Sequence, residues 1–356
     1  MENRKLLVTG GAGFIGANFV HYWVNQHPTD TLVVLDELTY AGVIASIQPL
    51  IDTGRIIFVK GNICDQQLIE KLLRDHQLNT VVHFAAESHV DRSITGPDAF
   101  IETNIIGTHS LLKAARQCWL VEKTAPEHRF HHVSTDEVFG ELGPEDPAFS
   151  ETTPYSPNSP YSASKAASDH LVQAYGETYG LKWTMSNCSN NYGPYHFPEK
   201  LIPLMITNAL QGKPLPIYGE GKNIRDWLYV EDHCRGIELI LNQERTTRSW
   251  NIGGINEWTN IDIVNAICDT LEKAFTEDPN LSREWPKCPT ANGKSINSLI
   301  TYVEDRSGHD WRYAIDPERI QSELGYTPSL QFADGLQKTI NWYLEHKIWW
   351  QPLLTA

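Results

Sequence analysis

The sequence is poor in cysteine and in basic residues, and it contains no long apolar run. Its six cysteines are scattered, with no Cys-x-x-Cys pair and no His/Cys cluster at zinc spacing, so no metal site is expected. We interpret the cysteines as reduced, buried thiols of a cytoplasmic protein. No stretch of about 20 apolar residues is present, which excludes a membrane-spanning helix.

Basic residues are also fewer than acidic residues. The 356 residues include 29 Lys and Arg against 44 Asp and Glu, which gives a formal net charge of −15. Such a chain has no broad basic surface for the phosphates of nucleic acid or for an anionic membrane. We therefore expect neither partner. An anionic small molecule would need its own local cluster of Arg and Lys.

Short apolar strands alternate with amphipathic helical segments through the first half of the chain. Repeated units of this kind form a parallel, doubly wound sheet of the Rossmann type, in an α/β fold. The carboxyl ends of its strands meet in one ligand-binding cleft. The strands are predicted at 5–9, 32–35, 55–60, 80–84, 129–134 and 183–187.

Three spaced glycines, Gly10, Gly13 and Gly16, follow the first strand and precede a helical segment. Such glycines let the backbone turn tightly and approach a pyrophosphate at the helix N-terminus. The next strand ends at Asp36, about 20 residues later, where an acid binds the ribose hydroxyls and repels a 2′-phosphate. The pattern predicts an NAD site, and a glycine turn without a ligand is the alternative.

A Tyr-x-x-x-Lys pair, Tyr161 and Lys165, opens a predicted helix that starts at Ser159. The spacing places both side chains on one helix face. An ammonium beside a phenol is expected to lower the pKa of the tyrosine from about 10, so Tyr161 is a candidate base for a hydroxyl proton. Similar pairs begin at Tyr218 and Tyr343 but lack this context.

Two acids, Asp136 and Glu137, follow Thr135 at the end of the strand 129–134. They would give the same cleft a second acid–base pair, and an acidic turn without a role is the alternative. The loop 143–160 lies between them and the tyrosine helix, and we consider it a candidate lid.

These blocks together resemble the extended short-chain dehydrogenase/reductases and, within them, the dTDP-glucose 4,6-dehydratases. The resemblance implies bound NAD, a dTDP-sugar substrate and a homodimer. Residues 1–187 would form the NAD-binding Rossmann domain with the catalytic residues. Residues 188–356 would form mainly a smaller α/β lobe for the nucleotide sugar, with crossing of the chain between lobes allowed. The matching stretches are 10–16, 38–40, 85–93, 134–137, 161–165, 187–195, 198–203 and 225–232.

The resemblance further implies a lyase that oxidises C4 of dTDP-glucose, eliminates water across C5 and C6, and returns the hydride to C6. Tyr161 and Lys165 would serve the oxidation, Glu137 would be the base and Asp136 the acid of the elimination, and Thr135 would steady the 4-hydroxyl. The implied cofactor residues, besides Tyr161 and Lys165, are Gly10, Gly13, Phe14, Ile15, Gly16, Asp36, Glu37, Leu38, Thr39, Asn62, Ile63, Phe84, Ala85, Ala86, Ser88, Thr103 and Asn191. The implied substrate residues are Ser88, Thr135, Asn190, Lys200, Leu201, Arg225, Asn260, Asp305, Arg306 and His309.

The chain departs from the family pattern in three places. Glu37 replaces the usual lysine, Ser307 replaces the usual proline, and the polar segment 277–298 is expected to be a loose insertion. Two alternatives remain. A nucleotide-sugar epimerase, or a dehydratase of another nucleotide sugar, would share Tyr161 and Lys165, although epimerases typically lack the acid pair. A catalytically silent NAD-sensing protein would usually have lost the tyrosine or the lysine.

Overall fold

A seven-stranded parallel sheet forms the centre of the computed structural model, in which residues 3–244, 247–305 and 309–354 are described. Its strand order is β10-β6-β5-β4-β1-β2-β3, and each neighbouring pair is parallel. This confirms the predicted doubly wound sheet. The strands are β1 (Lys5–Thr9), β2 (Thr31–Asp36), β3 (Ile57–Lys60), β4 (Thr80–His83), β5 (Arg129–Thr135), β6 (Trp183–Cys188) and β10 (Arg248–Ile252).

Both faces of this sheet are covered by helices. Leu6 and Val8 of β1 pack into a cluster on one face, and Leu7 packs into a cluster on the other. Burial on both sides explains why β1, β2 and β4 are largely apolar runs without polar alternation. The first face is covered by α1 (Phe14–Gln26), α9 (Val230–Leu241) and α12 (Glu318–Leu324), and the second by α3 (Gln66–Asp75), α6 (Thr108–Ala115) and α7 (Pro160–Tyr179).

The helical stretch from residue 98 to residue 121 is divided into four segments. Two of them are π-helical, and such wide turns often occur at functional sites. The first π-helical segment carries Thr103, one of the predicted cofactor residues. The segments are α5 (Asp98–Phe100), η2 (Ile101–Gly107), α6 and η3 (Arg116–Val121), and the short helices before them are η1 (Ile44–Ser46), α2 (Gln48–Asp52) and α4 (Val90–Thr95).

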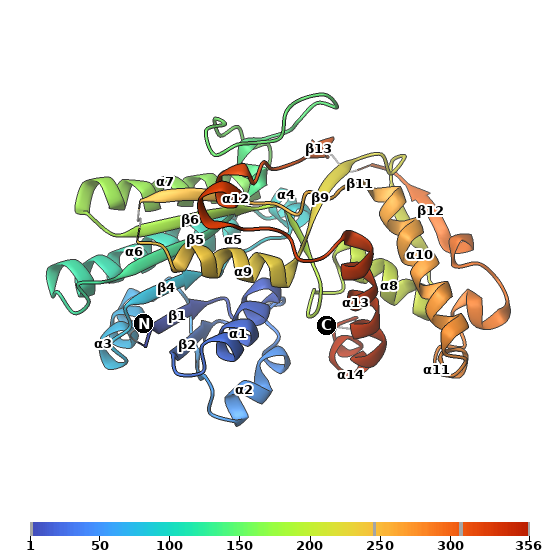
Figure 1. Ribbon diagram of the computed structural model, residues 1–356, viewed down its shortest axis with the longest axis horizontal. Coiled ribbons are helices and arrows are strands. Elements are labelled where there is room, and N and C mark those ends of the chain that lie inside the picture. The colour runs from blue at the N-terminus through green and yellow to red at the C-terminus, as the bar shows by residue number, and fades with distance from the viewer. Residues whose placement is uncertain (1–2, 245–246, 306–308, 355–356) are drawn as a thin grey trace.

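The second half of the chain builds a separate apolar cluster from three helices, which lie on the right in Figure 1. These helices are α8 (Leu201–Gln211), α10 (Asn260–Glu277) and α13 (Phe332–Glu345). Two small sheets accompany them. Their strands are β7 (Asn190–Tyr192), β8 (Leu215–Tyr218), β9 (Ile224–Tyr229), β11 (Glu257–Thr259), β12 (Ile300–Val303) and β13 (Arg312–Tyr313).

One strand of the central sheet comes from the second half of the chain. β10 pairs in parallel with β6, and Trp250 on β10 is fully buried beneath the helices of the first face. The chain therefore crosses back after residue 187. The division into two domains at that residue stays a prediction.

The polar segment 277–298 is compact, so the expectation of a loose insertion was wrong. Trp285 stacks on Trp350 with the ring centroids 5.6 Å apart, and Cys288 and Ile296 are fully buried. A few apolar side chains among polar neighbours are enough to pack this segment against the apolar cluster of α8, α10 and α13. Its elements are α11 (Leu281–Glu284), η5 (Pro289–Asn292) and η6 (Ile296–Leu299), and the C-terminal ones are α14 (Lys347–Trp350) and η7 (Pro352–Leu354).

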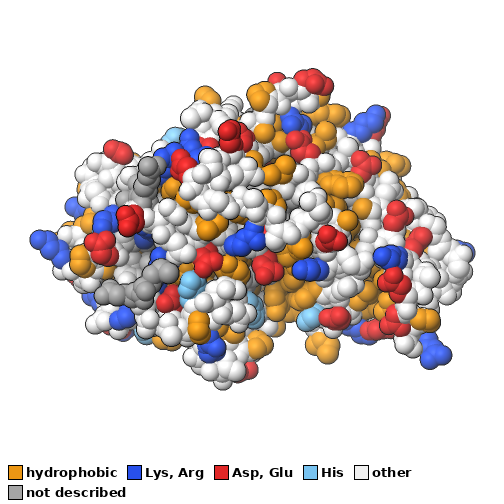
Figure 2. Space-filling model, in the orientation of Figure 1, with side chains coloured by type: hydrophobic (Ala, Val, Ile, Leu, Met, Phe, Trp, Pro, Cys, Tyr) orange, Lys and Arg blue, Asp and Glu red, His pale blue; other side chains and the backbone are white. Residues whose placement is uncertain are grey.

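The surface carries both signs of charge. On the face shown in Figure 2, acidic and basic side chains are interspersed, without a broad basic area. Among the helices of the described ranges, none has the length and apolar character needed to cross a bilayer.

Candidate active site

A cavity of about 510 Å³ lies at the carboxyl ends of the central strands. Residues from the second half of the chain close it from the other side. It brings together the predicted catalytic residues Thr135, Asp136, Glu137, Tyr161 and Lys165. Of the other predicted site residues, those that line it are Gly10, Gly13, Phe14, Ile15, Gly16, Asp36, Glu37, Thr39, Ile63, Phe84, Ala85, Ala86, Ser88, Thr103, Asn190, Asn191, Lys200, Leu201, Arg225, Asn260 and His309.

Two predicted cofactor residues lie behind this lining. The backbone N–H of Leu38 donates to Asp36 Oδ1 at 2.8 Å, and the amide of Asn62 donates to Glu37 Oε1 at 3.0 Å. Both residues therefore orient acids that line the cavity, Asp36 and Glu37. Glu37, the departure from the family pattern, is held in this way by a partner of its own.

After β12, the residues His309 and Asp310 line the cavity. Asp305 does not line the cavity, but its Oδ1 lies 2.6 Å from Nδ1 of His309, which does. Arg306, another predicted substrate residue, lies outside the described residues.

The glycine turn has the geometry that a dinucleotide requires. Gly10 has a φ of +70°, and a Cβ added to Gly16 would lie only 2.1 Å from the carbonyl oxygen of Gly10. The helix α1 then starts at Gly13 without a side-chain cap, so its first N–H groups are available to a phosphate. Asp36 is fixed by the N–H of Ala12, which donates to Oδ2 at 2.9 Å. These residues fit NAD.

The Tyr161 helix begins as the sequence predicts. Ser159 and Ser162 form a capping box, with the N–H of Ser162 donating to Ser159 Oγ at 3.1 Å, and Pro160 occupies the first turn. This start places Tyr161 in the first helical turn, facing the cavity with 9% exposure. Lys165 follows one turn later and is 4% exposed.

The expectation that the pKa of Tyr161 lies below its ordinary value was wrong for the chain by itself. Burial, and then the charge of Glu137, raise the pKa of Tyr161 well above its ordinary value. The Lys165 ammonium instead donates to the carbonyl oxygen of Val133 at 2.8 Å. Burial lowers the pKa of Lys165, and the charge of Asp169 opposes this shift.

The acid pair is built by the end of β5 and the turn η4 (Asp136–Phe139). The hydroxyl of Thr135 accepts the N–H of Glu137 and donates to Asp136 Oδ1, both at 3.3 Å. Asp136 is 2% exposed, and its Oδ2 has no hydrogen-bond partner in the protein. Burial, followed by the charge of Glu137, raises the pKa of Asp136 well above its usual range. Asp136 is therefore suited to carry a proton, and its neighbour, less deeply buried, is suited to accept one.

Two cations reach the cavity from the second half of the chain. The Arg225 guanidinium lies 4.5 Å from the ring centre of Tyr313 and donates to the carbonyl oxygen of Asp310 at 2.9 Å. Lys200 donates to the carbonyl oxygen of Ser88 at 3.3 Å. They supply the local positive charge that an anionic ligand of this acidic chain would require.

The sequence can now be compared with known proteins. The family model described as GDP-mannose 4,6 dehydratase matches residues 7–339. The dTDP-glucose 4,6-dehydratase of Neisseria meningitidis is 50% identical, over 99% of this chain and 97% of that protein. The chain belongs to the dTDP-glucose 4,6-dehydratase family.

Solved structures agree with this membership. A dTDP-glucose 4,6-dehydratase of Streptomyces venezuelae with NAD bound has a TM-score of 0.86 at 45% identity, covering 98% of this chain and 99% of that one. A UDP-glucose 4-epimerase of Thermus thermophilus in complex with NAD has a TM-score of 0.81 at 26% identity, covering 96% and 99%. The fold is thus shared by dehydratases and epimerases.

Several lining residues of this family member escaped the sequence analysis. His89 and Glu199 lie at the cavity rim, where the Arg92 guanidinium pairs with Glu199 at 3.3 Å and lies 3.6 Å from the ring centre of Tyr40. No periodicity marks such residues, although His89 lies within the matching stretch 85–93 and Glu199 within 198–203. The other lining residues missed include His196, Phe197, Pro216, Ile217, Tyr218, Trp227, Asp310 and Tyr313.

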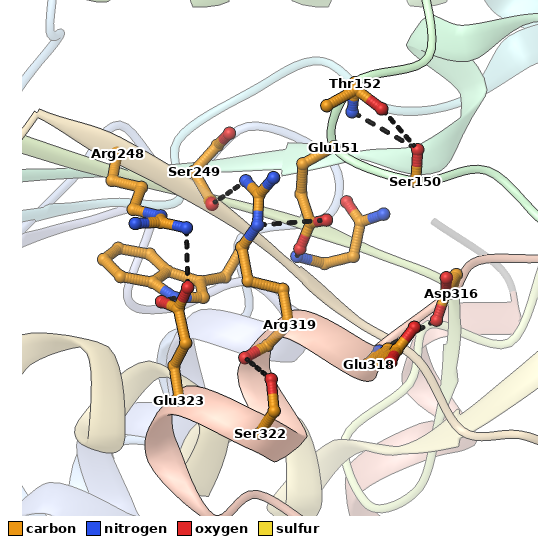
Figure 3. A network of polar contacts seen from close by, with 12 residues as sticks. Ser150, Glu151, Thr152, Arg248, Ser249, Asp316, Glu318, Arg319, Ser322 and Glu323 are labelled. Carbon is orange, nitrogen blue, oxygen red and sulfur yellow. Dashed lines mark hydrogen bonds and ion pairs between the residues drawn. The ribbon is translucent and has the colours of Figure 1, made fainter.

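The loop 143–160, considered a lid, is fixed away from the lining of the cavity. In Figure 3, Glu151 lies against Arg319, whose Nε is 3.5 Å from Oε2, and Glu151 Oε1 accepts the N–H of Asn251 at 2.9 Å. Phe149 forms a bridge to Ile315. No residue of 143–160, all of it described, lines the cavity. These anchors oppose the lid hypothesis.

Among the described residues, no group of three or more His, Cys, Asp or Glu side chains could hold a metal ion. The six cysteines are free, and five of them are buried.

Proposed function

We propose that this chain is a lyase that converts dTDP-glucose to dTDP-4-keto-6-deoxyglucose and water, with NAD as its bound cofactor. The observation that carries the proposal is the meeting of Tyr161 and Lys165 with Asp136 and Glu137 in one cavity. A simple dehydrogenase needs only the first pair. The dehydratases that resemble this chain at about half identity give the sugar and the nucleotide.

The first step is oxidation at C4, for which Tyr161 takes the proton of the 4-hydroxyl. Held against the turn of Gly10, Gly13 and Gly16, bound NAD would supply the redox chemistry, as acceptor of the hydride from C4 and as its donor to C6. Because burial raises the pKa of Tyr161, the phenolate needs the positive charge of the oxidised nicotinamide together with that of Lys165. Thr135 donates to the sugar oxygen as its charge develops.

The second step is loss of water. The C4 ketone acidifies the proton on C5, and Glu137 removes it. The electron pair of this bond forms the double bond between C5 and C6 as the bond from C6 to its hydroxyl breaks. Asp136, held protonated by burial, gives its proton to the leaving hydroxyl, which departs as water. Glu137 then returns a proton to C5 as C6 is reduced.

The proposal is tested with the purified protein and no added NAD. Incubation with dTDP-glucose should give the absorbance of the keto product in alkali, and incubation with UDP-glucose should give much less. A product with an intact 6-hydroxyl, inverted at C4, would establish an epimerase instead. No product from either sugar nucleotide would contradict the proposed activity.

We also propose that two copies pair through the face of η2, η3 and α7. Four large apolar side chains on these segments are exposed by 43 to 54%. They are Ile101, Ile106, Val121 and Tyr179. The double variant Ile106→Glu, Val121→Glu should sediment as a monomer where the parent chain sediments as a dimer. A cytoplasmic location, finally, is proposed because all six thiols are free.

A further inference from the structure

A buried carboxyl, Asp169, has no place in the steps described above. It lies one helical turn beyond Lys165 on α7, and the spacing of four residues puts both side chains on one helix face. Asp169 is fully buried. The face that carries it packs against β5, the strand that ends in Thr135.

The contacts of this face are with three consecutive residues of β5. Asp169 Oδ2 accepts the hydroxyl of Ser134 at 2.8 Å, and its Oδ1 lies 3.1 Å from Nε2 of His132. The residue between them, Val133, accepts the Lys165 ammonium at 2.8 Å. The helix is thereby held in one register on the strand, directly before the acid pair. Tyr155 adds a further donor to Asp169 Oδ2, at 3.0 Å.

A buried ammonium needs an opposite charge, because removal from water is otherwise too costly. Burial lowers the pKa of Lys165, and Asp169 exerts the main opposing influence. Burial raises the pKa of Asp169 to about 6, while Lys165 and the hydroxyls of Ser134 and Tyr155 oppose the rise. The carboxyl is thus ionised at neutral pH and can serve as the counter-charge.

The other titratable groups around the pair come from β4, β5, β6 and α7. Burial lowers the pKa of His83 and His132 well below the usual value, so both are uncharged at neutral pH. Burial raises the pKa of the Cys188 thiol to about 12, so it is uncharged too. The neighbouring His170 lowers the pKa of Asp169 as well.

We propose that Asp169 is a positioning residue for the catalytic pair, because its carboxylate is the buried counter-ion of Lys165 and ties α7 to the strand that carries the acids. It acts through Lys165 and does not touch the cavity, since it is absent from the lining. The inference rests on the proposed oxidation at C4.

The decisive variant is Asp169→Asn, which keeps the size of the side chain and removes its charge. Without the counter-ion Lys165 loses its proton more readily, and the Tyr161 phenolate becomes harder to form. The acid limb of the pH profile of kcat/KM should therefore move up by about 1 to 2 pH units. At neutral pH kcat should fall about tenfold or more, with KM for dTDP-glucose changed by less than about threefold.

A second variant covers the case in which Asp169→Asn does not fold. Ser134→Ala removes one donor to the carboxylate and leaves its charge, so the pKa of Asp169 rises. The acid limb should then move upward by a smaller amount. Asp232→Asn is the matched control, because Asp232 is a buried carboxylate on α9 that accepts the N–H of Ser329 at 2.9 Å. It should lower stability and leave the limb in place.

The outcomes separate the two proposals. If the parent chain makes no keto product from dTDP-glucose, the proposed function fails and this inference fails with it. If the parent chain makes the product but the limb of a folded Asp169→Asn variant, or of Ser134→Ala, stays at the parent position, the inference alone is overturned. Asp169 would then contribute packing and hydrogen bonds only.

Discussion

Replacing Asp136 by asparagine tests the role proposed for this residue, the acid of the elimination, without removing the rest of the site. The amide keeps the volume of the side chain and its contact with Thr135, but it cannot donate a proton to the C6 hydroxyl. Loss of a general acid typically costs about 10² to 10⁴ in rate, which corresponds to roughly 3 to 5 kcal/mol of barrier. Product formation from dTDP-glucose should fall by that factor, while reduced nicotinamide still forms on the enzyme.

The same substitution should stabilise the fold at higher pH. Because the folded pKa of Asp136 lies above the unfolded one, the stability it contributes is complete below the unfolded pKa, about 4, and is lost as pH rises toward the folded pKa. Asparagine does not ionise and keeps this stability. The difference in unfolding free energy, variant minus parent, should grow by up to about 1.4 kcal/mol per pH unit over that window.

The assay is urea denaturation of both proteins between about pH 5 and about pH 8, alongside product formation at neutral pH. Titrating groups that do not interact with Asp136 are common to both chains and cancel in the difference. The reasoning is refuted if the difference in unfolding free energy is flat across this range. It is equally refuted if the variant eliminates water within about tenfold of the parent rate.

Further predictions concern other parts of the molecule. Glu137→Gln should prevent solvent deuterium from entering C5 while the ketone still forms, and deuterium at the parent level in the product would exclude Glu137 as the base. Tyr161→Phe should lower oxidation by about 10² to 10⁴, whereas near-parent turnover would remove the phenol from the mechanism. Gly16→Ala should purify with little NAD, because its Cβ would lie 2.1 Å from the carbonyl oxygen of Gly10. If the absorbance spectrum of the variant showed as much bound NAD as the parent, the glycine turn would not be the NAD site. Trp285→Ala should lower the free energy of unfolding, measured by urea denaturation, by about 3 to 5 kcal/mol. A decrease below about 1 kcal/mol would indicate that the segment 277–298 is loosely packed.

The parts that could be predicted depend on local patterns. β1, β2 and β4 are apolar runs because both faces of the sheet are covered, and this pattern needs no knowledge of distant residues. The glycine turn and the pair of Tyr161 and Lys165 depend on spacing within one turn or one helix. Parallel strands then bring their ends together by topology alone, so the cleft followed from the order of the elements.

The parts that escaped prediction depend on contacts between segments far apart in the chain. β10 has only five residues and pairs with a strand more than fifty positions away, which no local pattern marks. The direction of the Tyr161 pKa follows from depth of burial, and the sequence gives no measure of depth. The spacing of Asp169 and Lys165 can be read from the sequence. The contacts of Asp169 with Ser134 and His132 depend on how α7 packs against β5, which the sequence does not show.

In the proposed mechanism, adjacent carboxyls with opposite tasks are the feature that separates this site from a simple dehydrogenase. Both follow one strand, and both are the same chemical group with nearly the same intrinsic pKa. The turn η4 places Asp136 inside, at 2% exposure with one oxygen unpartnered, and leaves Glu137 partly exposed. The charge of Glu137 itself helps Asp136 to keep its proton. In the proposed mechanism the difference in burial therefore assigns the two acids their roles, and exchanging their depths of burial should exchange those roles.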